Sequence, residues 1–408
     1  MSVTRKRVAI EGFDRISNLP KEVTDEILMC LPIRDAVKTS LLSTNWRYRW
    51  SSMPNLVFQN LDIGEQQRDK LVNFVNQALL LHNGTVSLFK LDNFLEYGCS
   101  DVDRWIVVLS RKMLNHLFLK FNQTENPYRV PGSLFSCQFL KSLTLEFCEI
   151  RLPPQLEKLG CLTVLELKYV ILTSDTLETL VVKMPLLRVL KVCQCKPLTH
   201  FNIDAPKLKT VFIAGLYRSV KFRKTPKVTS AKFFVTSLMT QSIDEVLEGL
   251  DALQSVVVYI FPIGAAPERL NVTYHHLKVI QIFLDFEFSK GIMGLLCLLR
   301  SSPILQSIDM KAICRKSSVH LDDENIWEAH EADIFHHLKD VRFCKFKGLQ
   351  HELKLTKFIL SKAVVLETLC IIWDQSVLAD GKLMLVVNMM QFQRASSKAK
   401  VIFNEKGS

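Results

Sequence analysis

The sequence lacks the features that would place this protein in a membrane or outside the cell. Its first residues, MSVTRKRVAIEGF, contain no apolar core of signal-peptide length, and no run of about 18 uninterrupted apolar residues occurs anywhere. The eleven cysteines stand singly in hydrophobic segments such as LEFCEI and VRFCKF, which is typical of reduced packing residues and not of a disulfide framework. We therefore expect an intracellular protein, in the cytoplasm, the nucleus or both, without membrane association.

Signatures of catalysis and of cofactor binding are also missing. The sequence contains no GxxxxGK[ST] or G-x-G-x-x-G phosphate loop and no HExxH or CxxC pair. The adjacent histidines at 275–276 and 336–337 have no further ligands at metal-binding spacing, so surface or core histidines are the better interpretation. We expect no catalytic residue, no cofactor and no metal site. An enzyme therefore ranks behind the non-catalytic binding functions.

The composition indicates a folded protein that carries excess positive charge. Of the 408 residues, 48% are hydrophobic, which is enough to fill the cores of two or three domains. The formal net charge of +11 argues against acidic, self-repelling linkers. It is compatible with weak association with acidic proteins or nucleic acid.

Residues 14–60 predict a small helical module. Pro20 suits a first helical turn, and Val23, Ile27 and Leu31 recur at intervals of four, so one stripe of the first helix is apolar. Pro32 disfavours continuation of that helix. A module of about 45 residues lies near the size at which its own core no longer suffices, so its remaining apolar surface should be covered by something else.

Two further helices are expected in the same module. Ala36, Val37, Leu41 and Leu42 indicate a second short helix. Trp46 and Trp50, four residues apart, would share one face of a third helix.

The string L19-P20-x-E22-V23, I27-L28-x-x-L31-P32 and S43-x-x-W46-R47-x-x-W50 resembles the F-box. The resemblance implies docking on a Skp-type adaptor, which bridges to a cullin scaffold in a ubiquitin ligase. Thr44 and Asn45 depart from many relatives, which have basic residues there, and this departure would weaken adaptor binding. The competing interpretation is a three-helix subdomain packed on its own chain. The residues expected to contact the adaptor or to fill the module's core are Leu19, Pro20, Val23, Ile27, Leu28, Leu31, Pro32, Val37, Leu42, Trp46 and Trp50.

The middle of the chain repeats a pattern with apolar residues at relative positions one, four and six. The copies are L114NHLFL, L140KSLTL, L162TVLEL, L187RVLKV, L208KTVFI, V228TSAKF, L253QSVVV, L277KVIQI and L305QSIDM, with V86SLFKL as a further terminal copy. Their starts are 20 to 28 residues apart, which is the period of leucine-rich repeats. Each unit would bury its face only by stacking on its neighbours. A generic α/β core is the alternative.

Position five of each copy points away from the buried positions four and six, so we expect it on a concave binding face. These residues are Thr144, Glu166, Lys191, Phe212, Val257, Gln281 and Asp309.

A basic cluster occupies the segment between Asp204 and Asp244, which contains no carboxylate. A solenoid would concentrate its charge along one edge, where it could bind an acidic or phosphorylated substrate or simply remain solvated. Nucleic acid is not expected as the ligand, because few aromatic residues are interleaved. The cluster consists of Lys207, Lys209, Arg218, Lys221, Arg223, Lys224, Lys227 and Lys232.

The last quarter of the chain changes character. Residues 316–329 are expected to form an acidic linker or insertion. The strand pattern then returns as L338KDVRF and L366ETLCI, with a helix expected between them. Residues 330–408 resemble the FBD domain of plant F-box proteins, through VRFCKFKG, ELKLTKFILSKAVVLETL and RASSKAKVIF. This unit should cover the exposed edge of the last repeat.

The sequence thus predicts an α+β protein with the organisation of a plant-type F-box/FBD/leucine-rich-repeat protein. A flexible segment 1–13 would precede the three-helix F-box at 14–60. An irregular α/β leucine-rich-repeat solenoid over 61–315, with repeats from about residue 86, and the FBD unit would follow. The function implied is a non-catalytic substrate-recognition subunit of a Skp-cullin-F-box ubiquitin ligase, which binds a protein substrate through the repeat and FBD regions. The alternative is a basic scaffold for an acidic protein or nucleic acid without a ligase role.

Overall fold

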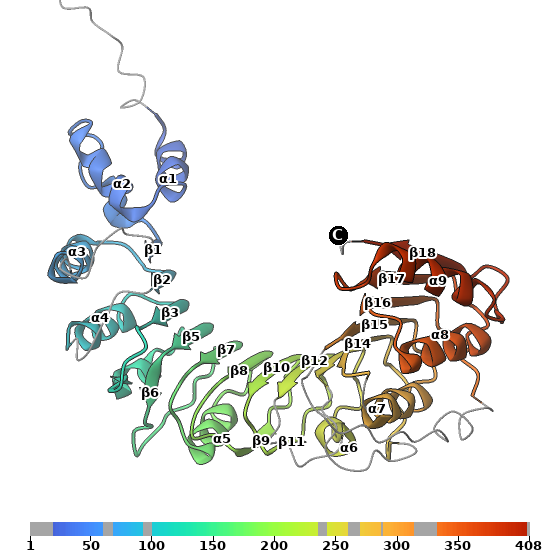
Figure 1. The fold of residues 1–408 in the computed structure, drawn as a ribbon. Helices are drawn as coiled ribbons and strands as arrows, with labels where there is room; N and C mark the ends of the chain where they lie inside the picture. The colour runs from blue at the N-terminus through green and yellow to red at the C-terminus, as the bar shows by residue number, and fades with distance from the viewer. Residues whose placement is uncertain are drawn as a thin grey trace, which may run out of the picture. The chain divides into compact units, whose positions relative to one another are not determined.

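The computed structural model describes residues 19–59, 68–92, 100–235, 243–259, 270–286, 289–313 and 333–405. The chain divides into two compact units, Met1–Phe147 and Cys148–Ser408, both drawn in Figure 1. The predicted N-terminal segment 1–13 and the predicted acidic linker 316–329 lie outside the described residues.

The N-terminal unit combines the small helical module with a parallel sheet. Strands β1, β2, β3 and β5 pair in that order, and every pair is parallel. The elements of this unit are α1 (Lys21–Met29), α2 (Ile33–Lys38), the 3₁₀ turns η1 (Thr39–Leu41) and η2 (Arg49–Ser52), β1 (Asn55–Phe58), α3 (Arg68–Leu81), β2 (Leu88–Leu91), α4 (Ser100–Ser110), β3 (His116–Lys120), β4 (Tyr128–Val130), the 3₁₀ turn η4 (Gly132–Ser136) and β5 (Ser142–Glu146).

The predicted third helix around Trp46 and Trp50 is wrong. The segment that carries Trp46 is a series of turns, in which Tyr48 has a φ of 148°, and only the four residues of η2 follow as a helical turn. A positive φ at a bulky residue does not fit a continuous α-helix. Both indole rings nevertheless lie in the interior, with 2% and 3% of their surface exposed.

The C-terminal unit is built on one long parallel sheet. Strands β7, β8, β10, β12, β13, β14, β15, β16, β17 and β18 pair in this order. Its strands are β6 (Cys148–Ile150), β7 (Val164–Lys168), β8 (Val189–Cys193), β9 (His200–Asp204), β10 (Thr210–Gly215), β11 (Ser219–Arg223), β12 (Ser230–Val235), β13 (Ser255–Tyr259), β14 (Val279–Leu284), β15 (Ser307–Ala312), β16 (Asp340–Phe346), β17 (Thr368–Trp373) and β18 (Lys400–Asn404).

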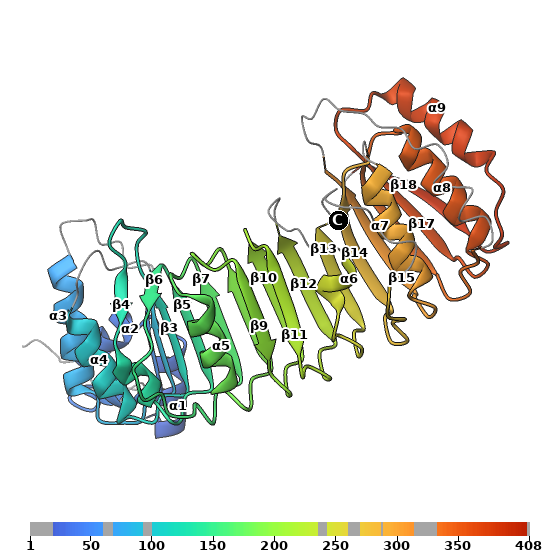
Figure 2. The ribbon, with the colours of Figure 1, turned by 90° about the horizontal axis from the view of Figure 1, so that it is seen from below.

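Helices cover one face of this sheet. They are α5 (Ser174–Val182), α6 (Ile243–Leu247), α7 (Ser289–Arg300), α8 (Gln350–Lys362) and α9 (Ala379–Met390). Figures 1 and 2 show α5 to α8 on the same side of the strands. The short pair β9 and β11 packs against α5 and α6 and so lies on the helical side as well. The opposite face, called the open face below, carries none of the described helices.

The predicted repeats coincide with the strands. In each of the twelve predicted copies, from V86SLFKL to L366ETLCI, the strand begins two residues after position one. Leu165 and Leu167 illustrate the burial, since both have no exposed surface while Glu166 between them is partly accessible. The segment M53PNLVF has the same spacing and forms β1, so the ladder starts one copy earlier than predicted.

Several copies end with a residue in the left-handed conformation. Phe147, Tyr169, Gln194 and Lys345 all stand at relative position eight, with φ between 53° and 60°. This conformation turns the chain out of the strand so that position nine enters the interior, where Cys195 is 3% exposed. In these four copies position nine is Cys148, Val170, Cys195 or Phe346, and each is at most 3% exposed.

The chain after residue 333 extends the same ladder. Strand β16 pairs with β15, and α8 and α9 each lead to another parallel strand, β17 and β18. The predicted helix between L338KDVRF and L366ETLCI is confirmed as α8. The boundaries assigned to the FBD unit remain predictions.

Candidate binding surfaces

The structure sorts the predicted contact residues of the N-terminal module into interior and surface. Leu28, Trp46 and Trp50 are at most 3% exposed and form its core with Ile33 and Ala36. As the structure stands, a partner could not reach these three predicted residues. Sequence alone could not separate them, because an interior and an interface position both require apolar side chains.

The same module leaves other large apolar side chains in solvent. Val23 and Ile27 on α1 are 40% and 38% exposed, and Leu42 is 63% exposed. Leu41, which was not among the predicted contacts, is 87% exposed. Pro20 and Pro32 are also exposed, while Leu19, Leu31 and Val37 are half-buried. These side chains give the module an accessible apolar surface that its own core does not use.

A hydrogen bond ties the helix that carries this surface to the rest of the module. Arg49 on η2 donates from Nη1 to Thr24 Oγ1 at 2.6 Å, and the Thr24 hydroxyl donates to Lys21 O at 2.8 Å. Thr24 is 1% exposed. Thr44 and Asn45, where the sequence departs from many F-boxes, are exposed.

The open face of the C-terminal unit carries position five of each repeat in one row. The strand register aligns Glu166, Lys191, Phe212, Lys232, Val257, Gln281 and Asp309 across β7 to β15. Most are partly accessible, as predicted, but Val257 is only 5% exposed between the longer side chains of its two neighbours in the row. Thr144, in the N-terminal unit, is 9% exposed and so offers little surface for binding.

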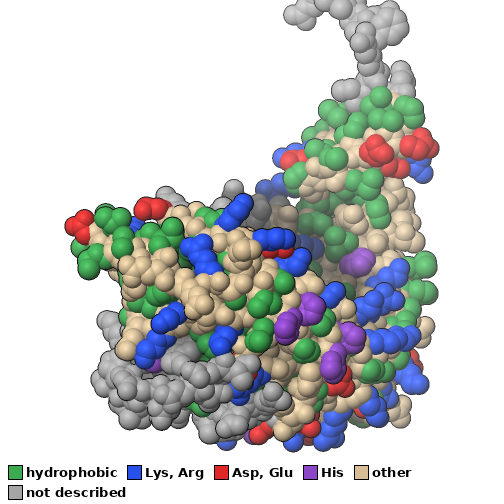
Figure 3. All heavy atoms as spheres, turned by 90° about the vertical axis from the view of Figure 1, so that its right-hand side faces the viewer, with side chains coloured by type: hydrophobic (Ala, Val, Ile, Leu, Met, Phe, Trp, Pro, Cys, Tyr) green, Lys and Arg blue, Asp and Glu red, His purple; other side chains and the backbone are tan. Residues whose placement is uncertain are grey.

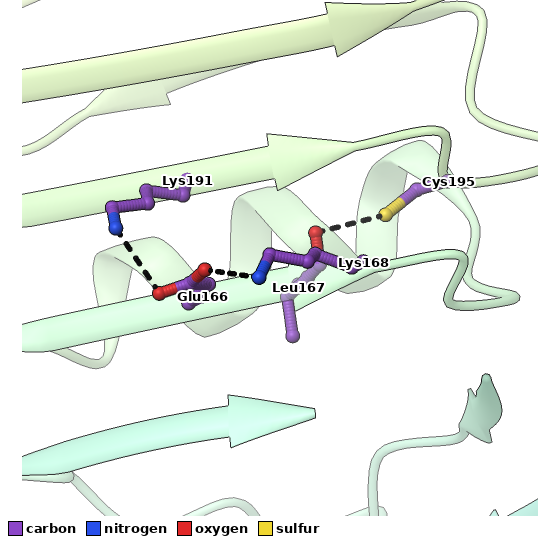
Figure 4. A network of polar contacts seen from close by, with 5 residues as sticks. All are labelled: Glu166, Leu167, Lys168, Lys191 and Cys195. Carbon is purple, nitrogen blue, oxygen red and sulfur yellow. Dashed lines mark hydrogen bonds and ion pairs between the residues drawn. The ribbon is translucent and has the colours of Figure 1, made fainter. Parts of the chain in front are cut away.

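One end of this row is an ion-pair network. Glu166 accepts from Lys168 Nζ at 2.8 Å through Oε1 and from Lys191 Nζ at 3.2 Å through Oε2 (Figure 4). Burial acts to raise the pKa of Glu166, but the hydrogen bonds and charges of the two lysines outweigh it and hold that pKa below its ordinary value. Glu166 is therefore ionised and its two lysines are partly neutralised.

Aromatic rings occupy the centre of the open face. Phe234 lies 5.5 Å from both Phe212 and Phe283, measured between ring centroids, and Tyr259 lies 5.6 Å from Phe283. Lys311 Nζ stands 5.7 Å from the centroid of Phe283. All four rings are partly exposed, which makes them suited to contact with an apolar or aromatic side chain of a partner. Residues on four neighbouring strands form this aromatic patch, which no local sequence pattern revealed.

The predicted basic cluster does not form a single edge. All eight side chains are exposed. They do not gather on one surface, because side chains alternate along each strand and because β9 and β11, which were not predicted, form a separate pair. Lys221 and Arg223 lie on β11 on the helical side, whereas Lys232 lies on the open face. Lys207, Lys209 and Lys227 precede strands, and Arg218 and Lys224 flank β11; Lys224 Nζ also pairs with Asp204 Oδ2 at 3.1 Å.

A small cavity in the C-terminal unit holds a buried carboxyl group. Glu352 lines this cavity of about 60 Å³ and has no exposed surface. Its Oε2 atom accepts backbone N–H groups of Lys347, Gly348 and Leu349 at 2.7 to 3.0 Å. These bonds organise the start of α8, which is a structural task.

The described residues carry neither a metal-site candidate nor a membrane-spanning helix. No group of three or more His, Cys, Asp or Glu side chains in that part of the chain could hold a metal ion. None of its helices combines the length and apolar character needed to cross a membrane.

Three family models match the chain. The F-box domain model matches residues 16–58. The model of the LRR repeats of the FBD-associated F-box protein At5g56370 matches residues 102–243. The model of the LRR domain of At1g61320/AtMIF1 matches residues 181–377.

Similar proteins of Arabidopsis thaliana span nearly the whole chain. The F-box/FBD/LRR-repeat protein At1g13570 is 31% identical over 417 aligned positions, which cover 96% of this chain and 99% of that protein. The putative FBD-associated F-box protein At5g56440 is 25% identical and covers 96% of this chain and 100% of its own length. F-box/LRR-repeat protein 13 is 25% identical, with 97% and 98% covered.

Proposed function

This chain belongs to the F-box/FBD/LRR-repeat family, and we propose that it is the substrate-recognition subunit of a Skp-cullin-F-box ubiquitin ligase. In this proposal the N-terminal module docks on a Skp-type adaptor and the repeat region holds a protein substrate. The chain itself contributes no catalytic group. It raises the effective concentration of the substrate's lysines at the transfer enzyme, because tethering makes their encounter intramolecular.

The exposed apolar surface of the N-terminal module carries the adaptor half of the proposal. Val23, Ile27 and Leu42 are exposed although Leu28 and the two tryptophans already fill the core. Burying one such side chain against a partner contributes about 1.5–3 kcal/mol, which makes these three the strongest candidates for adaptor contact. Leu41 joins them because of its exposure.

The open face of the C-terminal unit supports the substrate half. Its aromatic patch, Phe212, Phe234, Tyr259 and Phe283, lies between Glu166 with its lysines at one end and Lys311 at the other. Rigid aromatic rings with charges around them are typical of the centre of a protein interface. We assign the main substrate contact to this face.

Binding to a purified Skp-type adaptor tests the adaptor half directly. The full-length chain should bind the adaptor in isothermal titration calorimetry, and the double variant Val23→Asp, Ile27→Asp should lose at least about tenfold in affinity through burial of charge. Leu80→Asp is the matched control, since Leu80 on α3 is 83% exposed but lies outside the module. No binding by the unmodified chain at micromolar concentration, or an equal loss in the control, would contradict the proposal.

A further inference from the structure

A five-residue motif occurs twice in the chain. Residues 274–278 read Tyr-His-His-Leu-Lys and residues 335–339 read Phe-His-His-Leu-Lys. Each copy directly precedes a strand of the long sheet, β14 in the first case and β16 in the second. The proposed adaptor and substrate contacts use neither copy.

Both copies are anchored on each side of their two histidines. In the first, Tyr274 and Leu277 have no exposed surface, and the Tyr274 hydroxyl donates to Leu247 O at 2.9 Å. In the second, Phe335 N donates to Lys362 O at 2.9 Å, and Leu338 is 1% exposed.

The anchors leave the remaining residues of the motif facing outward. They are exposed in both copies: His275, His276, Lys278, His336, His337 and Lys339. We call these six residues the HHLK edge.

The sheet register sets the two copies side by side with one strand between them. Val279 pairs with Ser307, which pairs with Asp340, so Lys278 and Lys339 flank Gln306. Gln306 N donates to Lys278 O at 2.9 Å, and Lys339 N donates to Gln306 O at 2.8 Å. Two strand spacings separate the copies by roughly 10 Å. Figure 3 shows histidine side chains grouped beside Lys and Arg side chains on this side of the molecule.

Carboxylate groups on either side of the HHLK edge limit the length of its positive surface. Between the copies the turn before β15 exposes Pro303 and Gln306, neither of which is charged. On the far side of the second copy, Glu367 Oε1 lies 3.4 Å from Lys339 Nζ, both side chains being about half exposed. On the far side of the first copy, Asp251 is exposed before β13. At the second copy, Asp340 follows Lys339 and is also exposed, and Asp333 pairs with Arg300 at 2.8 Å. The edge therefore combines two lysines and four histidines with carboxylates at its rim, over a span of three strands.

We propose that the HHLK edge binds an extended peptide segment with two anionic side chains three residues apart. In the polyproline II conformation an extended chain advances about 3.1 Å per residue with three residues per turn, so side chains i and i+3 point to the same side and lie roughly 9 Å apart, close to the separation of the copies. Each ammonium group supplies three donors, and an imidazole ring supplies at least one more. Because every group is exposed, one copy alone binds weakly, and both must be engaged together.

As a substrate contact, this surface rests on the proposed receptor function, but peptide binding is measured without the adaptor. Loss of adaptor binding would leave the HHLK edge intact, and failure of the edge would leave the adaptor result unchanged. Carboxylate and phosphoryl groups share the required chemistry, so separate peptides distinguish them.

Fluorescence anisotropy with the full-length chain tests the proposal. Three labelled peptides share an alanine and glycine background and carry two phosphoserines, two aspartates or two serines at positions i and i+3. A fourth carries the two phosphoserines next to each other. We expect affinity to fall from phosphoserine to aspartate to serine, to fall again for the adjacent pair, and to weaken with added salt.

Variants locate the binding. Lys278→Gln with Lys339→Gln, and separately His275→Gln with His336→Gln, should each weaken binding of the spaced phosphoserine peptide, the lysine pair by about tenfold. Lys70→Gln with Lys158→Gln removes the same charge from exposed lysines outside the proposed binding surfaces and should change affinity less than twofold. Equal binding of the serine peptide, or an equal loss in this control, would overturn the proposal.

Discussion

Arg49 Nη1 lies 2.6 Å from Thr24 Oγ1 and joins the η2 turn to the α1 helix across the N-terminal module. The same guanidinium donates from Nε to Asn45 O at 2.9 Å, so it also fixes the turns before η2. Since α1 carries Val23 and Ile27, this hydrogen bond sets where the proposed adaptor contacts stand relative to the buried Trp50.

Replacing the Thr24 hydroxyl should loosen the module. Thr24→Val keeps the shape of the side chain but leaves the Arg49 donor without this acceptor, so we expect a loss of about 1–2 kcal/mol in the free energy of unfolding. Urea denaturation followed by circular dichroism measures it. Thr24→Ser, which retains the hydroxyl, should stay near the parent value, and equal losses in both variants would show that the hydrogen bond contributes nothing.

Neighbouring residues on α1 should have separable effects. Leu28→Ala creates a cavity in the core and should reduce the free energy of unfolding by about 2–5 kcal/mol. Ile27→Ala removes an exposed side chain and should leave stability within about 0.5 kcal/mol while it weakens adaptor binding. Calorimetric titration and urea denaturation of the two variants compare these readouts. A stability loss in Ile27→Ala as large as in Leu28→Ala would contradict the assignment.

Glu352 should stabilise the protein through its oxygen atom and not through its charge. Glu352→Ala leaves three backbone N–H groups without their acceptor and should cost about 3 kcal/mol or more in the free energy of unfolding. Glu352→Gln retains an acceptor and should cost far less. Denaturation of both variants at neutral pH makes the comparison, and similar losses would count against it.

The charge of Glu352 predicts a pH dependence. Burial raises the pKa of this carboxyl, although the three backbone N–H groups act to lower it. Because the folded pKa lies above the unfolded one, the folded state holds the proton more tightly, and the stability gained is present below the unfolded pKa and lost as pH rises through the folded pKa. The stability of Glu352→Gln relative to the parent should therefore improve as pH rises through this window, in denaturation measured at a series of pH values.

The thiols should differ sharply in reactivity. Burial raises the pKa of Cys137 to about 11 and that of Cys195 to about 12, and it raises the pKa of Cys148 as well. Cys30 and Cys161 are exposed. Mass spectrometry after brief treatment of the native protein with iodoacetamide at pH 8 should find the exposed pair modified and the three buried thiols unmodified. Rapid labelling of Cys195 in the folded protein would contradict its burial.

The repeat pattern was readable because its physical cause is local. Alternation in a strand requires apolar side chains at positions four and six, as at Leu165 and Leu167, whatever the neighbouring copies contain. The F-box was equally accessible, since its prolines and tryptophans stand at fixed spacing. The segment M53PNLVF carried the same signal as the other repeats, and only its place inside the helical module concealed it.

Other features depend on contacts between distant residues. The fate of Trp46 could not be predicted from its spacing to Trp50, because a turn can bury both rings as well as a helix can. Lys221 and Lys232 belong to one basic run in the sequence, yet they lie on opposite faces because one stands on β11 and the other on β12. The motif at 274–278 and 335–339 was visible, but only the register showed that one strand separates its copies.

The sequence by itself determined the family, the repeat architecture and the presence of an apolar helical module, because each is encoded in residue spacing within one segment. The tertiary structure alone decided which of the module's apolar residues face solvent, how the basic side chains are distributed, and that four aromatic rings and the HHLK edge assemble from separate repeats. Burial and proximity across strands are properties of packing, and packing joins residues that the sequence keeps far apart.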